Sequence, residues 1–314
     1  MTINRSPMSQ SVSGIINVNK PPGITSMDVI RRIRRASGLR RVGHSGTLDP
    51  LASGVMVVAL GVGTRLLEYV TEFNKSYAAK IELGKSTDTY DGEGETIKSE
   101  LEVIVSDSDV RSAIQTFKGT QSQIPPMHSA IKVDGIKLYD LARKGITIDR
   151  APRVVNLYDA YISNFKSPEL ELQITCSKGF YVRTLANDLG IQLGCGAYLK
   201  ELVRTSVGKF KIEDSLNLDF IEFNLQKDKS SILLQKLETA LDPIPKLRLD
   251  FDTTQKVQNG ISIPAEGSHK AAKNSSISMA LSEEGRLVAI MRFDEEGLIW
   301  KPEKVFHDQI QKIN

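Results

Sequence analysis

The clearest pattern in the chain is a strict alternation of apolar and polar residues in PELELQITC, positions 168 to 176. Such alternation is typical of a strand with one buried and one solvated face. The apolar face would hold Leu170, Leu172, Ile174 and Cys176. The run VMVVALG at 55 to 61 is instead continuously apolar and ends in glycine, which predicts a fully buried strand. Two further strands are predicted at 14 to 19 and at 75 to 84.

Helix signals lie between these strands. Thr25 followed by Asp28 forms a capping box, and the amphipathic helix that it begins is expected to stop at Gly38. The segment LYDLARKG at 138 to 145 predicts a short helix with a glycine stop. It closes a segment from 124 to 145 that is rich in Pro, Gly and Lys and is typical of a long functional loop.

A strand-to-helix transition is predicted after the alternating strand. The residues FYVRT are expected to continue the extended chain and to lead into a helix over LANDLGIQLG, 185 to 194. Thr184 is the expected N-cap of this helix. Arg183 is thereby predicted to lie where a strand ends and a helix begins, a position that can present a side chain into a cleft.

The length of the chain and the positions of its prolines and glycines predict two domains. The chain has 314 residues, whereas one domain usually has roughly 100 to 200. The proline-interrupted DPIPK at 242 to 246 is the candidate boundary, and after it short strands alternate with glycine turns, which predicts a small β-barrel. The expected organisation is a flexible N-terminus at 1–13, a first domain at 14–241 and a second domain at 247–314.

The composition is that of an ordinary folded protein. Apolar residues make up 40% and charged residues 25%, which excludes disorder across the whole chain. Cys176 and Cys195 form no C-x-x-C pair and the four histidines are scattered, so reduced thiols are expected rather than a disulfide or a zinc site. No apolar run reaches the length of a membrane span and the N-terminus has no apolar core, so we expect a cytoplasmic protein.

Charge is distributed unevenly, although the net charge is only +3. The stretch RRIRRASGLRR at 31 to 41 carries six arginines and no acid. A solvated helix face would explain this run, but its place directly before GHSGTLDPLASG at 43 to 54 makes phosphate binding an equal alternative. The chain between Lys85 and Arg111 is acidic, and most of that segment is expected to be solvated surface that faces away from a site, although Asp88 and Asp91 lie in a turn close to the end of the preceding strand.

Few residues in the sequence are candidates for catalysis or for binding a cofactor. No Gly-rich phosphate loop is present, because GVGTR at 61 to 65 is a lone GxG, so no nucleotide cofactor is expected. Neither a serine nucleophile elbow nor a metal cage is found in the sequence. The remaining candidates are a single carboxylate in a turn, Asp49, a strand tyrosine, Tyr77, and Arg183.

Four motifs, in order along the chain, resemble those of the tRNA pseudouridine-55 synthases, the TruB family: GHSGTLDPLASGV, KSYAAKIELG, QSQIPPMHSAIKVDGIKLYDLARKG and CSKGFYVRTLANDLG. The resemblance runs from about Gly14 to Phe210, and the C-terminal region resembles a PUA-type RNA-binding domain more weakly through RLVAIMRF and WKPEKVF. Two departures are Phe180, where small residues are common, and Val203, where a second arginine is usual. The resemblance implies a mixed α/β (α+β) fold with a central, mostly antiparallel sheet and a small C-terminal PUA-like β-barrel.

The resemblance also implies a reaction that needs no cofactor and no metal. A uridine in the T-loop of tRNA, position 55 in tRNA numbering, has its C1′–N1 bond cut, the uracil turns, and C5 is joined to C1′. Cleavage builds positive charge on the sugar, which a fixed carboxylate can stabilise, attack, or relieve by removing a proton. By resemblance Asp49 is that carboxylate, and the sequence leaves open which of these steps it performs.

The same motifs imply further site residues. Arg183 would pair with Asp49 and oppose the rise in carboxyl pKa that burial causes. Tyr77 would stack on the flipped uracil, and its hydroxyl would take part in removing the C5 proton. Tyr181 and Leu202 would complete the walls of the base pocket, where stacking offsets part of the cost of flipping.

RNA contacts are implied outside the base pocket. His44 would contact the RNA where the uridine has left the stack, and Lys20 would support the site. Arg40, Arg41 and Lys132 suit phosphate contacts, whose contribution weakens as salt rises. The C-terminal domain would hold another part of the tRNA, and a monomer without an obligate protein partner is expected.

Three alternatives remain open. A guide-dependent synthase of the dyskerin type shares the Asp motif, although this chain lacks long lysine-rich tails. A non-catalytic RNA chaperone would bind and refold tRNA through the same basic surface. A nucleoside hydrolase would release free uracil.

Overall fold

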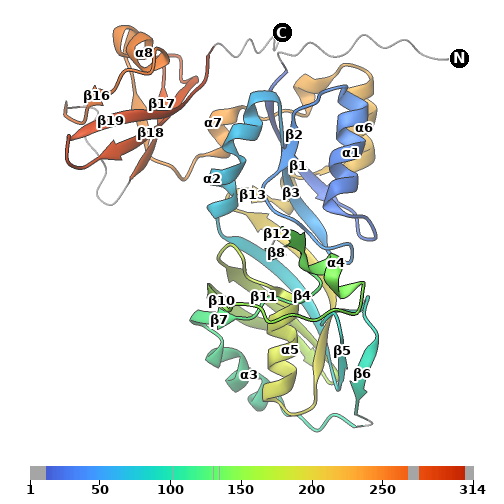
Figure 1. Cartoon of the computed structure of the whole chain (residues 1–314). Coiled ribbons are helices and arrows are strands. Elements are labelled where there is room, and N and C mark those ends of the chain that lie inside the picture. The colour runs from blue at the N-terminus through green and yellow to red at the C-terminus, as the bar shows by residue number, and fades with distance from the viewer. Residues whose placement is uncertain (1–11, 101, 130, 134, 268–275, 308–314) are drawn as a thin grey trace, which may run out of the picture.

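The computed structural model describes residues 12–100, 102–129, 131–133, 135–267 and 276–307, and most of its strands form one ten-stranded sheet (Figure 1). The strand order is β14-β1-β3-β12-β4-β11-β10-β7, with β2 paired to β3 and β13 paired to β12. The strands of this sheet are β1 (Gly14–Lys20), β2 (Val42–His44), β3 (Ser53–Leu60), β4 (Lys75–Leu83), β7 (Gly119–Gln123), β10 (Arg153–Lys166), β11 (Glu169–Cys176), β12 (Ala197–Val207), β13 (Phe210–Lys211) and β14 (Leu216–Asn217).

Helices and two small hairpins surround this sheet. The helices of this part are α1 (Ser26–Ser37), η1 (Gly61–Leu66), α2 (Leu67–Glu72), α3 (Asp107–Thr116), α4 (Leu138–Ala142), α5 (Val182–Gln192), η2 (Ile212–Asp214), α6 (Leu218–Gln226), η3 (Ser230–Ile232) and α7 (Leu237–Ala240). The hairpins are formed by β5 (Lys85–Thr87) with β6 (Thr96–Ser99) and by β8 (Lys132–Val133) with β9 (Ile136–Lys137). Figure 1 shows α1 and α6 beside β1 and β3, and α3 and α5 beside β10 and β11.

The central sheet is mostly antiparallel, which confirms the expected fold class. Among the pairings of the described strands within this sheet, β1 with β14 and β3 with β12 are the parallel ones. The alternation predicted for β11 is confirmed, since its four apolar side chains are buried against the neighbouring strands. The predicted buried strand is confirmed as β3, in which seven of eight residues are buried.

The two halves of the sheet meet at a short seam. There β3 and β12 run parallel, with Ser53 opposite Val203 and Gly54 opposite Arg204. Gly54 has a φ of +99°, and a Cβ on it would lie 2.3 Å from the Arg204 carbonyl oxygen, so only glycine fits. The seam directly follows the loop that carries Asp49, which is therefore anchored where the halves touch.

Helix α1 forms as the sequence predicts. Thr25 caps its N-terminus in a capping box with Asp28, and Gly38 ends it in the left-handed region with φ 70°. Its buried stripe of Val29, Ile30 and Ile33 enters the main core, and α1 also packs against α6. The short helix predicted near 138 to 145 is confirmed as α4.

The start of α5 differs from the prediction. The chain leaves β11 at Cys176, turns, and enters the helix at Val182, so Tyr181 is the N-cap and the prediction of Thr184 as N-cap is wrong. A tertiary contact replaces the local cap: the Gln123 side chain accepts from Tyr181 N at 2.9 Å and donates to Tyr181 O at 3.3 Å. Arg183 consequently lies in the first turn of α5, where its side chain is buried.

The C-terminal region forms a five-stranded sheet in the order β15-β17-β18-β19-β16, as expected for a small β domain. Its elements are β15 (Lys246–Arg248), α8 (Phe251–Gln258), β16 (Ile263–Pro264), β17 (Ile277–Leu281), β18 (Leu287–Asp294) and β19 (Ile299–Val305). One face encloses its own core around the fully buried Trp300. The other face shares a core with the first domain, in which Ile290 and Phe306 join Leu66 and Tyr69.

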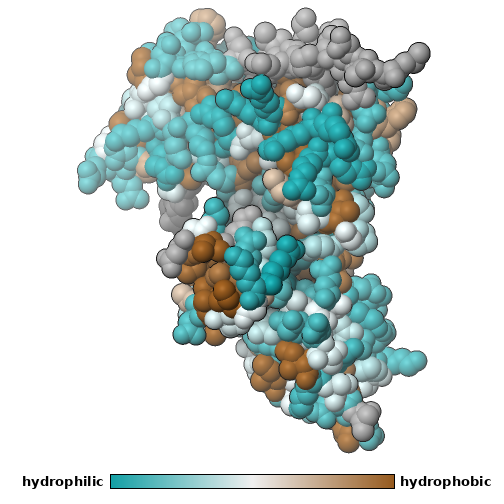
Figure 2. Space-filling model, turned by 45° about the vertical axis from the view of Figure 1, so that its right-hand side comes forward, coloured by the Kyte–Doolittle hydropathy of each residue, from teal (hydrophilic) through white to brown (hydrophobic). Residues whose placement is uncertain are grey.

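The surface is largely hydrophilic. On the face shown in Figure 2, hydrophobic residues gather in separate patches between hydrophilic ones. The exposed large apolar side chains belong to several different elements, among them Ile136 on β9, Tyr161 on β10 and Phe223 on α6. Exposed apolar residues distributed in this way are usual for a folded protein.

Candidate active site

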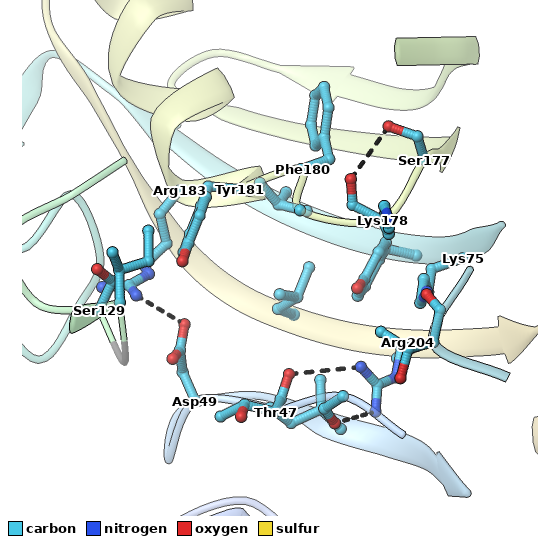
Figure 3. Close-up of a pocket in the computed structure, with 18 of the residues that line it drawn as sticks. Thr47, Asp49, Lys75, Ser129, Ser177, Lys178, Phe180, Tyr181, Arg183 and Arg204 are labelled. Carbon is cyan, nitrogen blue, oxygen red and sulfur yellow. Dashed lines mark hydrogen bonds and ion pairs between the residues drawn. The ribbon is translucent and has the colours of Figure 1, made fainter. Parts of the chain in front are cut away.

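A cavity of about 410 Å³ lies across the seam, within the range usual for ligand sites (Figure 3). The β3 half contributes Ser45 to Asp49 from the loop that precedes the strand. The other half contributes residues 177–183 before and within α5, together with side chains from β4 and β12. Segments far apart in the sequence are thus brought together around one space, as expected for a site at a junction.

The Asp49 loop, residues 45–52 between β2 and β3, is held by hydrogen bonds from Ser26 and Lys20 to its backbone. The Ser26 hydroxyl accepts from Leu48 N at 2.8 Å and donates to Leu48 O at 2.9 Å. Lys20 Nζ donates to Ala52 O at 2.6 Å, and burial lowers the pKa of this lysine to about 8. Because Leu48 itself is buried, the loop has few ways to move, and Asp49 is presented on a rigid support.

Arg183 lies between two carboxylates. Its Nη2 is 2.9 Å from Asp49 Oδ2, and its Nη1 is 3.2 Å from Asp91 Oδ2. Both nitrogens also donate to carbonyl groups, Nη1 to Thr89 O at 3.3 Å and Nη2 to His128 O at 2.9 Å. Fixed from four sides, the planar guanidinium orients the Asp49 carboxylate toward the cavity.

The two carboxylates differ in their access to solvent. The Asp91 side chain keeps 3% of its exposure, whereas the Asp49 side chain keeps 35% through the cavity. Burial by the surrounding protein raises the pKa of Asp49, and the Arg183 guanidinium opposes this rise most strongly. Asp49 is therefore the carboxylate that a ligand can reach, held beside a permanent positive charge.

Aromatic and apolar side chains form the walls. Tyr77 on β4 and Leu202 on β12 are each 8% exposed and line the cavity, as does the half-buried Tyr181. Burial raises the pKa of Tyr77 and of Tyr181, so both hydroxyls are neutral at pH 7. Phe180, one of the two departures from the family pattern, also lines this wall. A flat slot lined in this way suits a nucleobase.

The structure brings six of the predicted site residues to the cavity and leaves four outside its lining. Those that line it are Asp49, Tyr77, Arg183, Tyr181, Leu202 and Lys132. Those outside are Lys20 beneath the Asp49 loop, His44 at the end of β2, and the exposed Arg40 and Arg41 before that strand. His44 Nδ1 accepts from Gly46 N at 3.2 Å, and burial lowers the pKa of its imidazole.

Most of the arginine-rich run is occupied within the protein. Arg31 pairs with Asp28 at 2.6 Å, Arg34 donates to Val42 O at 2.8 Å, and Arg32 pairs with two acids of α6. Within the described residues no ion pair is found for Arg40 or Arg41. Arg40 and Arg41 are therefore the residues of this run that remain candidates for phosphate binding.

Several polar residues of the site were missed by the sequence analysis, among them Asp91 and Lys75. Asp91 was assigned to an acidic, solvated segment, but it is buried and pairs with Arg183. Lys75 lines the cavity, and its amine donates to Thr71 O and Phe73 O at the end of α2, while burial lowers its pKa to about 8. The two-residue spacing of Lys75 and Tyr77 on one strand face was a usable signal. The turn that holds Asp88 and Asp91 gave no local sign of which of the two carboxylates is buried.

No group of three or more His, Cys, Asp or Glu side chains among the described residues is arranged to hold a metal ion. No helix in the described part of the chain is long and apolar enough to cross a membrane.

Solved structures share this fold. A Cbf5-Nop10-Gar1 complex contains a chain that matches with a TM-score of 0.71 and 25% sequence identity, covering 94% of this chain and 85% of that one. An H/ACA RNP bound to a substrate RNA contains another, with a TM-score of 0.72 at 24% identity, covering 95% of this chain and 86% of that one.

Sequence comparisons identify the family. The model of the TruB family pseudouridylate synthase N-terminal domain matches residues 34–182, and that of the tRNA pseudouridylate synthase B C-terminal domain matches residues 183–247. A tRNA pseudouridine synthase B of Dehalococcoides mccartyi is 42% identical over 302 residues, 96% of this chain and 99% of that protein. One of Clostridium tetani is 42% identical over 253 residues, 80% of this chain and 86% of that protein. The chain belongs to the TruB family of pseudouridylate synthases.

Proposed function

We propose that the protein isomerises uridine 55 in the T-loop of tRNA to pseudouridine, with Asp49 as the catalytic carboxylate. The observation that carries this proposal is the placement of Asp49, which is open to the cavity, 2.9 Å from Arg183, and in the same cavity as Tyr77. Relatives that share most of the chain are named for tRNA pseudouridine synthesis, which supports tRNA as the substrate.

The chemistry balances without any further reactant. The C1′–N1 bond breaks and a C1′–C5 bond forms, while C5 loses one proton and N1 gains one. Asp49 stabilises or attacks the sugar as positive charge develops there, and Arg183 keeps the carboxylate ionised until that moment. Asp49, Arg183 and Tyr77 are the catalytic residues of this proposal, and no cofactor takes part in it.

The flipped uracil would occupy the slot between Tyr77, Tyr181 and Leu202. Stacking on an aromatic side chain stabilises a bound base by about 1 to 3 kcal/mol, which offsets much of the cost of taking the base out of its stack. Neutral tyrosines suit this role, since the rings remain apolar at their faces. Tyr77 also lies on the strand directly beside β12, so its ring position is fixed by the sheet.

The rest of the tRNA would contact basic residues around the cavity. Lys132 lines the cavity, Arg40 and Arg41 are exposed before β2, and His44 would contact the RNA where the uridine has left the stack. We assign catalysis to the domain at 14–241 and an additional RNA contact to the domain at 247–314. The protein would act in the cytoplasm as a monomer and without an obligate protein partner.

An unmodified tRNA transcript tests the proposal. Incubation with the protein alone, without guide RNA, is expected to yield pseudouridine at position 55 and no free uracil. A transcript with cytidine at position 55 is the matched control and should remain unmodified. Activity that required a guide RNA would favour the dyskerin-type alternative, release of uracil would favour a hydrolase, and binding without modification would leave only the chaperone.

A further inference from the structure

One buried arginine holds both ends of the Asp49 loop. Arg204 on β12 is 2% exposed, and its Nε donates to Val55 O at 2.6 Å. Its Nη2 donates to Gly46 O at 3.2 Å, and its Nη1 lies 3.5 Å from Thr47 O (Figure 3). Gly46 and Thr47 precede Asp49 in the chain and Val55 follows it, so a single guanidinium bridges the two sides of the loop.

The backbone of the same residue also forms the seam. Arg204 is one of two residues of β12 that pair with β3, and its partner is Gly54. The two strands approach so closely there that a side chain on Gly54 would collide with the Arg204 backbone. Arg204 therefore fixes the loop to the half of the sheet that carries Tyr77 and Leu202, through its main chain and through its side chain.

The charge of Arg204 is not balanced by an acid. Among the described residues no carboxylate lies within ion-pair distance of this guanidinium, and carbonyl oxygens and the Tyr77 hydroxyl accept its hydrogen bonds instead. Burying a cation without an anionic partner costs free energy, so an arginine in the cavity wall must be compensated by other interactions there. A planar fork of five donors can reach three carbonyl groups at once, which a lysine ammonium on a flexible stem cannot do with the same geometry.

We propose that Arg204 is a positioning residue, which acts through the carbonyl groups of the Asp49 loop to hold the Asp49 carboxylate in register with Arg183 and Tyr77. This inference rests on the proposed function, in which Asp49 performs the chemistry. Arg204 acts by positioning the loop and not by neutralising Asp49. The charged groups that change the pKa of the Asp49 carboxyl are Arg183, Asp91 and Lys20.

Two substitutions separate geometry from charge. Arg204→Lys keeps the charge and loses the fork, and Arg204→Gln loses both. A displacement of about 1 Å at a reacting group lowers a rate by about 100-fold, so both variants are expected to lose about that factor in single-turnover kcat. Their tRNA Kd should stay within about threefold of the unsubstituted protein, and the acidic limb of the pH–rate profile should not move.

A matched control removes a comparable buried hydrogen bond elsewhere in the sheet. Asn17 on β1 is 1% exposed, and its Nδ2 donates to Lys211 O at 2.7 Å. Asn17→Ala should lower the urea concentration at the midpoint of unfolding, as the Arg204 variants do, and leave kcat unchanged. Unfolding in urea and kcat per folded molecule are measured for all three variants.

The outcomes are distinct. Pseudouridine formation by the unsubstituted protein in the same assay reports on the proposed function, and the ratio of each variant to it reports on Arg204. The inference is overturned if folded Arg204→Lys retains kcat within threefold, or if the loss lies in tRNA binding alone. Failure of both Arg204 variants to fold, with Asn17→Ala folded, would also overturn it, since Arg204 would then hold the whole sheet rather than the loop.

Discussion

Two arginines in this protein each lie between two carboxylates, and they serve different ends. Arg32 on α1 is 2.5 Å from Asp219 and also pairs with Glu222, both on α6. Its side chain keeps 29% of its exposure and that of Asp219 keeps 81%. Arg183 forms the same arrangement with Asp49 and Asp91, but its side chain keeps only 4%.

The difference shows that burial, and not the pairing itself, turns a charge cluster into a site. Water screens the Arg32 network, so it contributes little more than a contact between two helices. At Arg183 the guanidinium and the Asp91 carboxylate are almost completely buried, so losing either of them leaves the other charge uncompensated. The open side of Asp49 is then the one place in that network where a ligand can take part.

Among substitutions in the two arginine networks that leave Asp49 in place, the largest effect is expected from Arg183→Lys. A lysine keeps a charge near Asp49 but cannot contact both carboxylates and two carbonyl groups at once. We expect single-turnover kcat to fall by about 100-fold or more with little change in tRNA Kd. Retention of kcat within threefold would show that the fork geometry at Arg183 is not needed.

The second carboxylate gives a pH test. The charge of Asp91 helps to raise the pKa of Asp49, and in the proposed reaction the ionised form of Asp49 is the active one. Activity should therefore rise with pH through a value above the ordinary 3.8 of an aspartate, and Asp91→Asn should move this acidic limb to lower pH. The plateau kcat should fall less than in Arg183→Lys.

Asp88→Asn is the matched control for that shift, since Asp88 lies in the same turn but is exposed. Its pH–rate profile should coincide with that of the unsubstituted protein. An unmoved limb in Asp91→Asn, or an equal shift in both variants, would contradict the coupling between the two buried carboxylates.

A smaller effect is expected at the exposed Arg40 and Arg41, for which no ion pair is found among the described residues. The double substitution of Arg40 and Arg41 by alanine should weaken tRNA binding by a few-fold at about 0.1 M salt, and the loss should shrink as salt is raised. The kcat at saturating tRNA should not change. Lys166→Ala, at the far end of the β10 strand that begins in the cavity wall, is the control and should bind normally; equal losses in both would point to a general charge effect.

The smallest effect is expected at the surface network. Arg32→Met should lower the free energy of unfolding by at most about 1 kcal/mol and leave both kcat and tRNA Kd unchanged. Urea denaturation and the transcript assay measure these quantities. A loss of kcat comparable to that of Arg183→Lys would remove the distinction between the two networks.

Local patterns in the sequence were enough to predict much of the fold. The capping box at Thr25, the glycine stop at Gly38 and the alternation of β11 are each determined by a few neighbouring residues, and the structure confirms all three. The predicted start of α5 was wrong because the side chain of Gln123, on β7, binds the backbone of Tyr181. Such a contact leaves no local signal at Thr184.

The candidate site was predicted through motifs and completed by the structure. Asp49, Tyr77 and Arg183 come together as the family resemblance implies. Asp91 and Arg204 could not be predicted, because their roles depend on partners distant in the sequence: Asp91 on Arg183, and Arg204 on the carbonyl groups of the Asp49 loop. Asp91 lies among exposed acids of the same type, and only its burial sets it apart.

The domain limits at 14–241 and 247–314 remain a prediction. The shared core that joins Ile290 and Phe306 to Leu66 and Tyr69 shows that the second region packs firmly on the first. Residues 1–11, 268–275 and 308–314 lie outside the described part of the chain, so the predicted flexible N-terminus falls mostly there.

The most direct test of the account is single-turnover pseudouridine formation by Asp49→Asn on a tRNA transcript, measured together with tRNA Kd. Asparagine has nearly the shape of aspartate but can neither attack the sugar nor carry the charge. The account predicts unchanged tRNA binding within about threefold and no pseudouridine above background. Modification at more than about a hundredth of the original rate would contradict it, since a group other than this carboxylate would then perform the chemistry.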